Sequence, residues 1–235
     1  MIYDVWYWVV IGAGMLLSFG ASALVKSTFA KYSQFTTRSG MTGADVARRI
    51  LADNGIHDVR VERVPGHLSD HYDPTNKVLR LSEAVYDQRN MAAFGVAAHE
   101  VGHAIQHATG YAPLKFRSAW VPLANIGSNL GIWVVFLSLV MGAARGAGLP
   151  FIIGLVGLGL FACATVFTLI TLPVEFDASK RAIVALENGG YTTTEEVEGA
   201  RKVLNAAAMT YVAAAAASIL QLLYWASLLL GNRDD

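Results

Sequence analysis

The chain has 235 residues and no net charge at pH 7. Hydrophobic residues make up 54% of the chain and charged residues only 15%, against roughly 25% charged residues in an average soluble domain. This composition excludes an intrinsically disordered chain, and the zero net charge argues against nucleic-acid binding. The single cysteine, Cys163, excludes a disulfide framework within the chain and a zinc finger built on cysteines.

Four uncharged stretches predict four transmembrane helices. They cover residues 5–25, 118–144, 146–174 and 203–232, which are 21, 27, 29 and 30 residues long. A helix needs roughly 20 predominantly apolar residues to cross a bilayer. One such stretch can be a core helix of a soluble protein, but four in one chain favour a membrane protein. We therefore expect a mainly α-helical membrane protein with spans within residues 1–25, 118–172 (a hairpin of two helices) and 206–230.

The distribution of Lys and Arg predicts the orientation of the chain. Segments 26–117 and 173–205 hold 16 of the 18 basic residues, and the other two are Arg145 and Arg233. Because basic residues stay on the cytoplasmic side, both segments are expected in the cytoplasm and both termini outside. No Lys or Arg precedes the first span, so we expect an uncleaved anchor and not a signal peptide.

The pattern of segment 26–117 is typical of a mixed α/β domain. Thr42 and Asp45 can form a capping box that starts a helix, and Gly55 ends it. Residues 59–64 and 78–81 alternate apolar and polar side chains, as half-buried strands do. The second of these strands comes shortly before another helix. We expect it to be an edge strand beside that helix and to bind a peptide by strand addition.

A second helix is expected from its cap at Asn90 to about Ala108, and it carries the sequence HEVGH at residues 99–103. His99 and His103 lie one turn apart on one helix face, about 6 Å along the axis, where two imidazoles can bind one metal ion. Glu100 points roughly 60° away from His103, within reach of a water on the metal. In the HExxH pattern this glutamate is the general base.

A catalytic zinc site needs a third protein ligand. His107 follows the two histidines at the same spacing, but it lies about 12 Å from His99 along the helix, too far to share one ion. We expect His107 to be a polar neighbour of the site. Glu175 and Asp177 follow the third span, so the hairpin returns them to the membrane face that carries the histidines. Both could instead be acids at a helix N-terminus, stabilised there by the helix dipole.

Three segments carry a resemblance to a known family: HLSDHYDP at residues 67–74, AAHEVGHAIQH at 97–107 and PVEFDAS at 173–179. Together they resemble the YugP-type membrane-bound neutral zinc metallopeptidases, and the similarity extends from about Tyr32 to the end of the last span. The resemblance implies a multi-pass protein of the bacterial cytoplasmic membrane. It also implies a zincin-like metalloprotease domain, built from segments 26–117 and 173–205, with one Zn²⁺ per chain.

The layout is also similar to the wider gluzincin group, including the HtpX-like enzymes, in which a later helix supplies the zinc-binding glutamate in a pattern ExxxD. Glu175 matches that glutamate, so the resemblance implies His99, His103 and Glu175 as the zinc ligands. Ser179 stands where the aspartate of that pattern would be. This difference affects the residue expected to support the zinc ligands and leaves Glu175 as a ligand. Asp177 is expected near the helix N-terminus or holding a ligand histidine by its other ring nitrogen.

The predicted reaction is zinc-dependent hydrolysis of a peptide bond. Zinc would supply an acidified water, and Glu100 would take its proton and pass it to the leaving amine. The oxyanion needs a further hydrogen-bond donor. Four residues are candidates for this role: His71, Tyr72, Tyr111 and Arg181.

Two other classes of protein stay open. A transporter with a zinc-stabilised cytoplasmic domain should carry ionisable residues along its spans, and the four uncharged stretches contain no Asp, Glu, Lys or Arg. A catalytically silent zinc-binding scaffold would have no need of Glu100 as a general base.

The HExxH helix is not expected to cross the membrane itself. Only eight uncharged residues, 91–98, precede His99, which is far short of a span. We therefore expect the active site at the cytoplasmic membrane surface. The expected partners are a peptide or membrane-protein substrate and the lipid bilayer, with no nucleic acid, and the sequence carries no signal for an oligomeric state or a protein partner.

Overall fold

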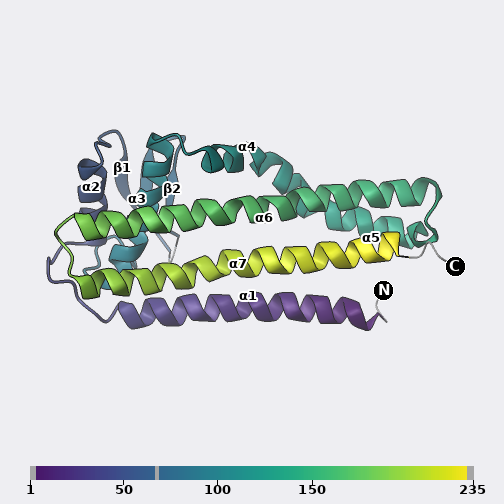
Figure 1. Ribbon diagram of the computed structural model, residues 1–235, viewed down its shortest axis with the longest axis horizontal. Helices are drawn as coiled ribbons and strands as arrows, with labels where there is room; N and C mark the ends of the chain where they lie inside the picture. Colours follow the sequence, from purple (N-terminus) through teal and green to yellow (C-terminus); the bar gives the residue numbers. More distant parts are fainter. Residues whose placement is uncertain (1–3, 67–68, 232–235) are drawn as a thin grey trace. The chain divides into compact units, whose positions relative to one another are not determined.

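The computed structural model describes residues 4–66 and 69–231. His67 and Leu68, which begin the first family-like segment, lie outside the described residues, as does Arg233. The elements are α1 (Val5–Tyr32), α2 (Gly43–Asp53), β1 (Arg60–Val64), β2 (His71–Asp73), β3 (Val78–Ser82), α3 (Met91–Ala108), α4 (Ala112–Ile126), the π-helix η1 (Gly127–Gly131), α5 (Ile132–Val140), the 3₁₀ turn η2 (Ala143–Arg145), α6 (Gly148–Asn188) and α7 (Thr194–Leu230) (Figure 1).

The chain divides into two compact units. Unit 1 comprises residues 1–20, 116–172 and 210–235, and unit 2 comprises residues 21–115 and 173–209. Each of α1, α6 and α7 contributes one part of its length to each unit. Unit 2 is therefore assembled from two separate stretches of sequence, and α6 enters it without a break in the helix.

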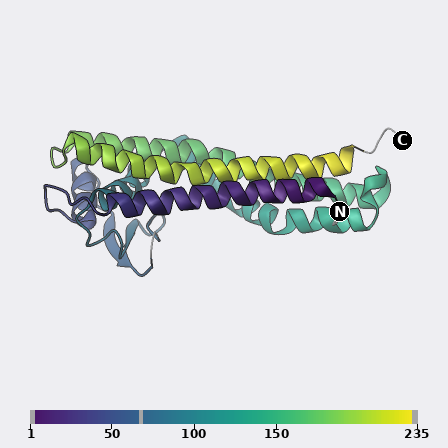
Figure 2. The ribbon, with the colours of Figure 1, turned by 90° about the horizontal axis from the view of Figure 1, so that it is seen from below.

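Four helical segments are long and apolar enough to cross a membrane, as predicted. They are Val5–Tyr32, Ala112–Val140, Gly148–Asn188 and Thr194–Leu230. Within unit 1, α1 runs antiparallel to α7 (Figures 1 and 2), and a Cβ on Gly14 would lie 3.5 Å from that of Ala217. Small residues at this contact let the two helices approach closely, as is common between helices in lipid.

Gly127 and Gly131 of the second span pack against α6. A Cβ on Gly127 would overlap the carbonyl group of Leu160, and one on Gly131 would lie 2.7 Å from the nitrogen of Phe161. Both glycines are buried, and the π-helix η1 lies between α4 and α5 at this contact. Gly142 and Gly146 flank η2 with φ of +95° and +72°, so the turn between the second and third spans uses the backbone freedom of glycine.

Unit 2 contains a three-stranded sheet in the order β1-β3-β2. β3 pairs in parallel with β1, in the register Arg60 to Val78, and antiparallel with β2, in the register Tyr72 to Leu79. The expectation that residues 78–81 form an edge strand is therefore wrong. Both edges of β3 are already paired, which excludes strand addition of a peptide to this strand.

The helix caps predicted for unit 2 are confirmed. Thr42 and Asp45 form the capping box of α2, and Gly55 follows its end with φ of +68°. The Asn90 side chain caps α3 by accepting a hydrogen bond from the nitrogen of Ala93 at 2.9 Å. The hydrophobic core of unit 2 contains buried side chains of α2, β3, α3, α6 and α7. Thirteen of the 18 residues of α3 are buried, so this helix is held in place on most sides.

Candidate metal centre

The two histidines of the HExxH motif lie side by side on α3. Their ring centroids are 4.8 Å apart and the rings are nearly perpendicular, at 83°. Both side chains are mostly buried, with 13% of His99 and 12% of His103 exposed. The i, i+4 spacing on a rigid, buried helix therefore produces the pair of imidazoles that the sequence predicts.

A glycine inside the motif lets α6 come close to these histidines. A Cβ on Gly102 would overlap the carbonyl oxygen of Ala178 and would lie 3.1 Å from its Cα. Only glycine fits at this contact, which places the backbones of α3 and α6 side by side. Glu175 and Ser179 lie on α6 within one turn of Ala178, so both side chains reach the histidines.

Glu175 completes a group of three potential ligands. Its Oε2 atom lies 3.3 Å from Nε2 of His99 and 3.5 Å from Nε2 of His103. One ligand atom from each of the three residues falls within 4.8 Å of the other two. The Glu175 side chain is only 4% exposed. Two imidazole nitrogens and one carboxylate oxygen match the donor set found in catalytic zinc sites, where a fourth position is left for water.

The electrostatics of His103 reflect the nearby carboxylates. Burial alone would lower its pKa, but the hydrogen bond to Glu175 and the negative charges of Glu100 and Glu175 outweigh burial and hold the pKa above its usual value. The same negative environment attracts a metal cation. Such a cation must displace the proton, because only neutral imidazole binds a metal.

Glu100 follows His99 on α3 and is 8% exposed. Its negative charge is one of the causes that raise the pKa of His103, so the carboxylate lies close enough to interact with the site. Within residues 4–66 and 69–231, no group donates a hydrogen bond to this carboxylate. Glu100 therefore has free acceptor capacity, which a general base requires.

Asp177 does not join the ligand group. Its Oδ2 atom accepts hydrogen bonds from Nε2 of Gln106 at 2.8 Å and from Nε of Arg181 at 2.6 Å. The expectation that Asp177 lies near a helix N-terminus is wrong, because α6 begins at Gly148 and residue 177 is in its interior. The same holds for the alternative that Glu175 is an N-terminal acid. The helix of the third span continues through both residues.

Ser179 contacts the first histidine. Its hydroxyl lies 3.1 Å from Nδ1 of His99. The serine therefore offers the imidazole a hydrogen bond without a negative charge, at the position where the pattern ExxxD has its aspartate. The hydrogen bond can hold the ring with Nε2 turned toward Glu175.

His107 and Tyr72 form a neighbouring pair. The Tyr72 hydroxyl lies 2.8 Å from Nδ1 of His107, one turn beyond His103 on α3. Burial is the main cause that raises the pKa of Tyr72 to about 12, and the charges of Asp58 and Asp73 contribute to the same shift. The phenol is therefore protonated at neutral pH and can donate a hydrogen bond. In the described part of the chain, His107 is not a member of the candidate ligand group.

The other candidates for the oxyanion donor are directed elsewhere. His71 precedes Tyr72 on β2, so its side chain points to the opposite face of the sheet. It is exposed, with Nδ1 2.9 Å from the carbonyl oxygen of Ser69. Arg181 binds Asp177, and its guanidinium lies 5.4 Å from the ring centroid of Tyr111. Tyr72 is thus the candidate whose side chain contacts the face of α3 that carries the histidines, through His107.

Two features of the site were missed at the level of sequence. Gln106 is fully buried, and its Oε1 atom lies 3.0 Å from Nδ1 of His103. Gly102 sets the distance between α3 and α6. The sequence does contain both signals, a small residue between the two histidines and a polar residue shortly after them. Their roles become clear only from their contacts with α6.

The fold and the site together define a multi-span membrane protein with a candidate metal centre on an HExxH helix. The chain belongs to the family described as "Putative neutral zinc metallopeptidase", whose model matches residues 7–230. It is 46% identical over 225 residues to a protein of Bacillus subtilis (strain 168) named "Putative membrane protease YugP", across 95% of this chain and 96% of that protein. The resemblance found in the three motifs is therefore confirmed. No solved structure matches the chain.

Proposed function

We propose that this chain is a zinc-dependent endopeptidase of the bacterial cytoplasmic membrane. The observation that carries the proposal is the convergence of His99, His103 and Glu175 beside Glu100. A site that only stabilised the fold would have four protein ligands and no adjacent carboxylate free to accept a proton. The family to which the chain belongs and the name of its Bacillus relative point in the same direction.

The chain's own residues supply most of the proposed chemistry. When bound, zinc would acidify a water molecule and polarise the carbonyl of the substrate. Glu100 accepts the proton of that water as it attacks the peptide carbonyl, and then delivers the proton to the leaving amine. The protonated phenol of Tyr72 donates a hydrogen bond to the oxyanion. Ser179 and Gln106 keep the two imidazoles turned toward the metal.

We further propose that the site faces the cytoplasm. The support is the distribution of basic residues, which concentrates 16 of 18 in segments 26–117 and 173–205. Four membrane spans then place both termini outside. A site at the cytoplasmic membrane surface would act on loops of membrane proteins or on unfolded polypeptides.

The deciding experiment is Glu100→Gln in the purified, detergent-solubilised full chain. The amide keeps the size of the side chain but cannot accept the proton, so hydrolysis of an unfolded protein substrate should fall by about 10²- to 10⁴-fold. Zinc content should stay at one ion per chain, because Glu100 is not a ligand. The matched control is Glu187→Gln, an exposed acid of α6 that pairs with Arg201, which should leave both quantities unchanged.

Near-normal hydrolysis by Glu100→Gln would refute the role of Glu100 as general base. A wild-type chain that binds zinc and hydrolyses no peptide would favour the silent scaffold. Movement of a solute across vesicles containing the chain, without hydrolysis, would favour the transporter.

A further inference from the structure

A buried glutamine connects the second histidine to α6. Gln106 is fully buried, and all the polar atoms of its amide have partners. Nε2 donates hydrogen bonds to the carbonyl oxygen of Val174 and to Oδ2 of Asp177, both at 2.8 Å. Oε1 lies 3.0 Å from Nδ1 of His103.

This network fixes the tautomer of His103. Two acceptors surround one end of the Gln106 amide, so that end must be the NH₂ group and the opposite end the oxygen. An oxygen facing Nδ1 of His103 requires that this nitrogen carries the hydrogen. In the neutral imidazole the lone pair is then on Nε2, the atom that lies 3.5 Å from Glu175. Gln106 thus presents the metal-binding nitrogen of His103 in the form that a metal ion needs.

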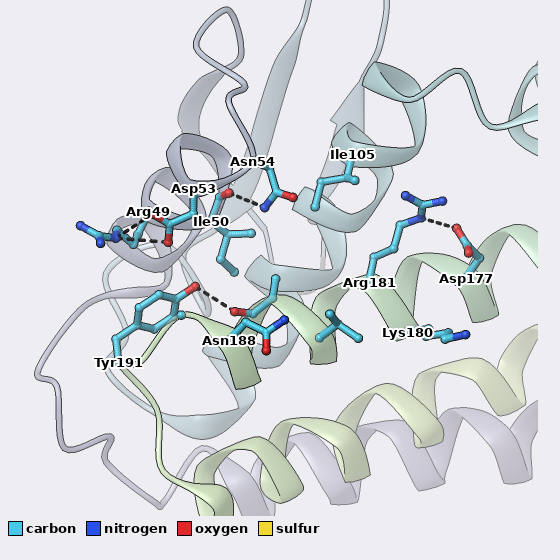
Figure 3. Close-up of a pocket in the computed structure, with 13 residues that line it drawn as sticks. Arg49, Ile50, Asp53, Asn54, Ile105, Asp177, Lys180, Arg181, Asn188 and Tyr191 are labelled. Atoms are coloured by element: carbon cyan, nitrogen blue, oxygen red, sulfur yellow. Dashed lines mark hydrogen bonds and ion pairs between the residues drawn. The ribbon is translucent and has the colours of Figure 1, made fainter.

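The chain of hydrogen bonds continues to the protein surface. Arg181 donates from Nε to the same Oδ2 atom of Asp177 at 2.6 Å, and its guanidinium lies over the ring of Tyr111. Asp177 and Arg181 line a cavity of about 680 Å³, whose other walls come from α2, from Ile105 of α3 and from the end of α6 with the turn that follows it (Figure 3). Figure 3 shows the Arg181 guanidinium turned back toward the Asp177 carboxylate. The guanidinium holds the carboxylate in position, and the carboxylate holds the glutamine.

The two histidines are therefore supported by the same helix in different ways. Ser179 contacts Nδ1 of His99 directly, and Asp177 reaches Nδ1 of His103 through Gln106. Two residues along a helix differ by about 200° around its axis, so Asp177 and Ser179 project from opposite sides of α6. Helix α6 thus supplies the third ligand, the residue that contacts His99, and the residue that anchors Gln106.

We propose that Gln106 is a positioning residue of the metal centre, held by Asp177 and Arg181, and that α6 in this way orients both imidazoles. The inference rests on the proposed function, in which His99, His103 and Glu175 bind zinc. It assigns no chemical step to Gln106, which acts only through His103. Residues that hold a ligand histidine by its second nitrogen contribute about 10- to 100-fold to metal affinity.

The test measures zinc affinity of the full chain in detergent by competition with a chelator, and the visible spectrum after cobalt substitution. Gln106→Met keeps a similar volume but removes the three hydrogen bonds, so zinc affinity should fall by about 10- to 100-fold and the cobalt spectrum should change. The control Glu187→Ala removes an exposed partner of Arg201 on α6 and should bind zinc as the wild type does.

Other results would overturn the inference. Wild-type zinc affinity and an unchanged cobalt spectrum in Gln106→Met, with zinc lost in His103→Ala, would refute the positioning role and leave the proposed function intact. Zinc retained in both His103→Ala and Glu175→Ala would instead refute the proposed metal site.

If Gln106→Met fails to fold without metal, Asp177→Ala tests the hydrogen bond between Asp177 and Gln106, since the Asp177 side chain is partly exposed and outside the core. Asp177→Ala should then lower zinc affinity several-fold, and an unchanged affinity would overturn the inference.

Discussion

Replacing Gly102 by alanine should separate the third zinc ligand from the other two. A Cβ at this position would overlap the carbonyl oxygen of Ala178 and lie 3.0 Å from its carbonyl carbon. Ordinary contact between such atoms is about 3.5 Å, so α3 and α6 must move apart locally by roughly 1 Å. Zinc–ligand distances tolerate only about 0.2 Å, and Glu175 lies on α6 within one turn of the contact. The shift should therefore lower zinc affinity by at least about tenfold and activity by about 10²-fold.

The effect on folding should be smaller than the effect on the metal. Overpacking costs about 1–3 kcal/mol, and the higher helix propensity of alanine offsets about 1 kcal/mol of that cost. Metal-free melting temperatures and chelator competition on the same preparations separate the two quantities. The matched control is Gly159→Ala, which lies on α6 with no atom within 4 Å of the added Cβ and should change neither. Wild-type zinc affinity in Gly102→Ala would refute the argument that this glycine sets the position of Glu175.

Three further predictions concern the ligand, the oxyanion donor and the topology. Glu175→Ala should lose zinc and activity together, as measured by metal content and peptide hydrolysis, and retention of zinc would show that another residue is the third ligand. Tyr72→Phe should lower kcat by about 10²-fold or more with zinc content unchanged. Because the pKa of Tyr72 is raised to about 12, its phenol stays protonated below about pH 11, and a Tyr72-dependent loss of activity between about pH 8 and 10 would contradict this role. A reporter inserted near Asn188 should behave as cytoplasmic and one fused to the C-terminus as external, and the opposite pattern would reverse the proposed topology.

The helices and the histidine pair could be predicted because their signals are local. Asn90 and Thr42 mark helix starts with side chains that cap the backbone, and the spacing of His99 and His103 places them on one helix face whatever surrounds it. The four spans follow from the length of uncharged sequence alone. None of these inferences requires knowledge of a contact with a distant segment of the chain.

The position of β3 could not be predicted in the same way, because strand pairing is set by distant segments. β1 alternates apolar and polar residues and is an edge strand, whereas four of the five residues of β3 are buried. The consecutive apolar residues Val78 and Leu79 were the signal that both faces of this strand are covered. The short strand β2, which supplies its antiparallel neighbour, has only three residues and gave no pattern to read.

The supports of the candidate site depend on α6, which follows the HExxH helix by some 70 residues. The role of Ser179 as a neighbour of His99, and of Asp177 as the anchor of Gln106, appears only when the two helices are packed together. Asp177 was expected near a helix start because it follows the predicted end of the third span. In the structure α6 continues through this position, with Pro173 inside the helix.

The proposed function depends on the binding of one zinc ion by His99, His103 and Glu175. The most direct measurement is anomalous diffraction at the zinc absorption edge from crystals of the active, purified chain. We expect a single peak per chain, about 2.0–2.2 Å from Nε2 of both histidines and from a Glu175 carboxylate oxygen. A zinc peak bound to other residues, or an active enzyme with no zinc at these three, would contradict it.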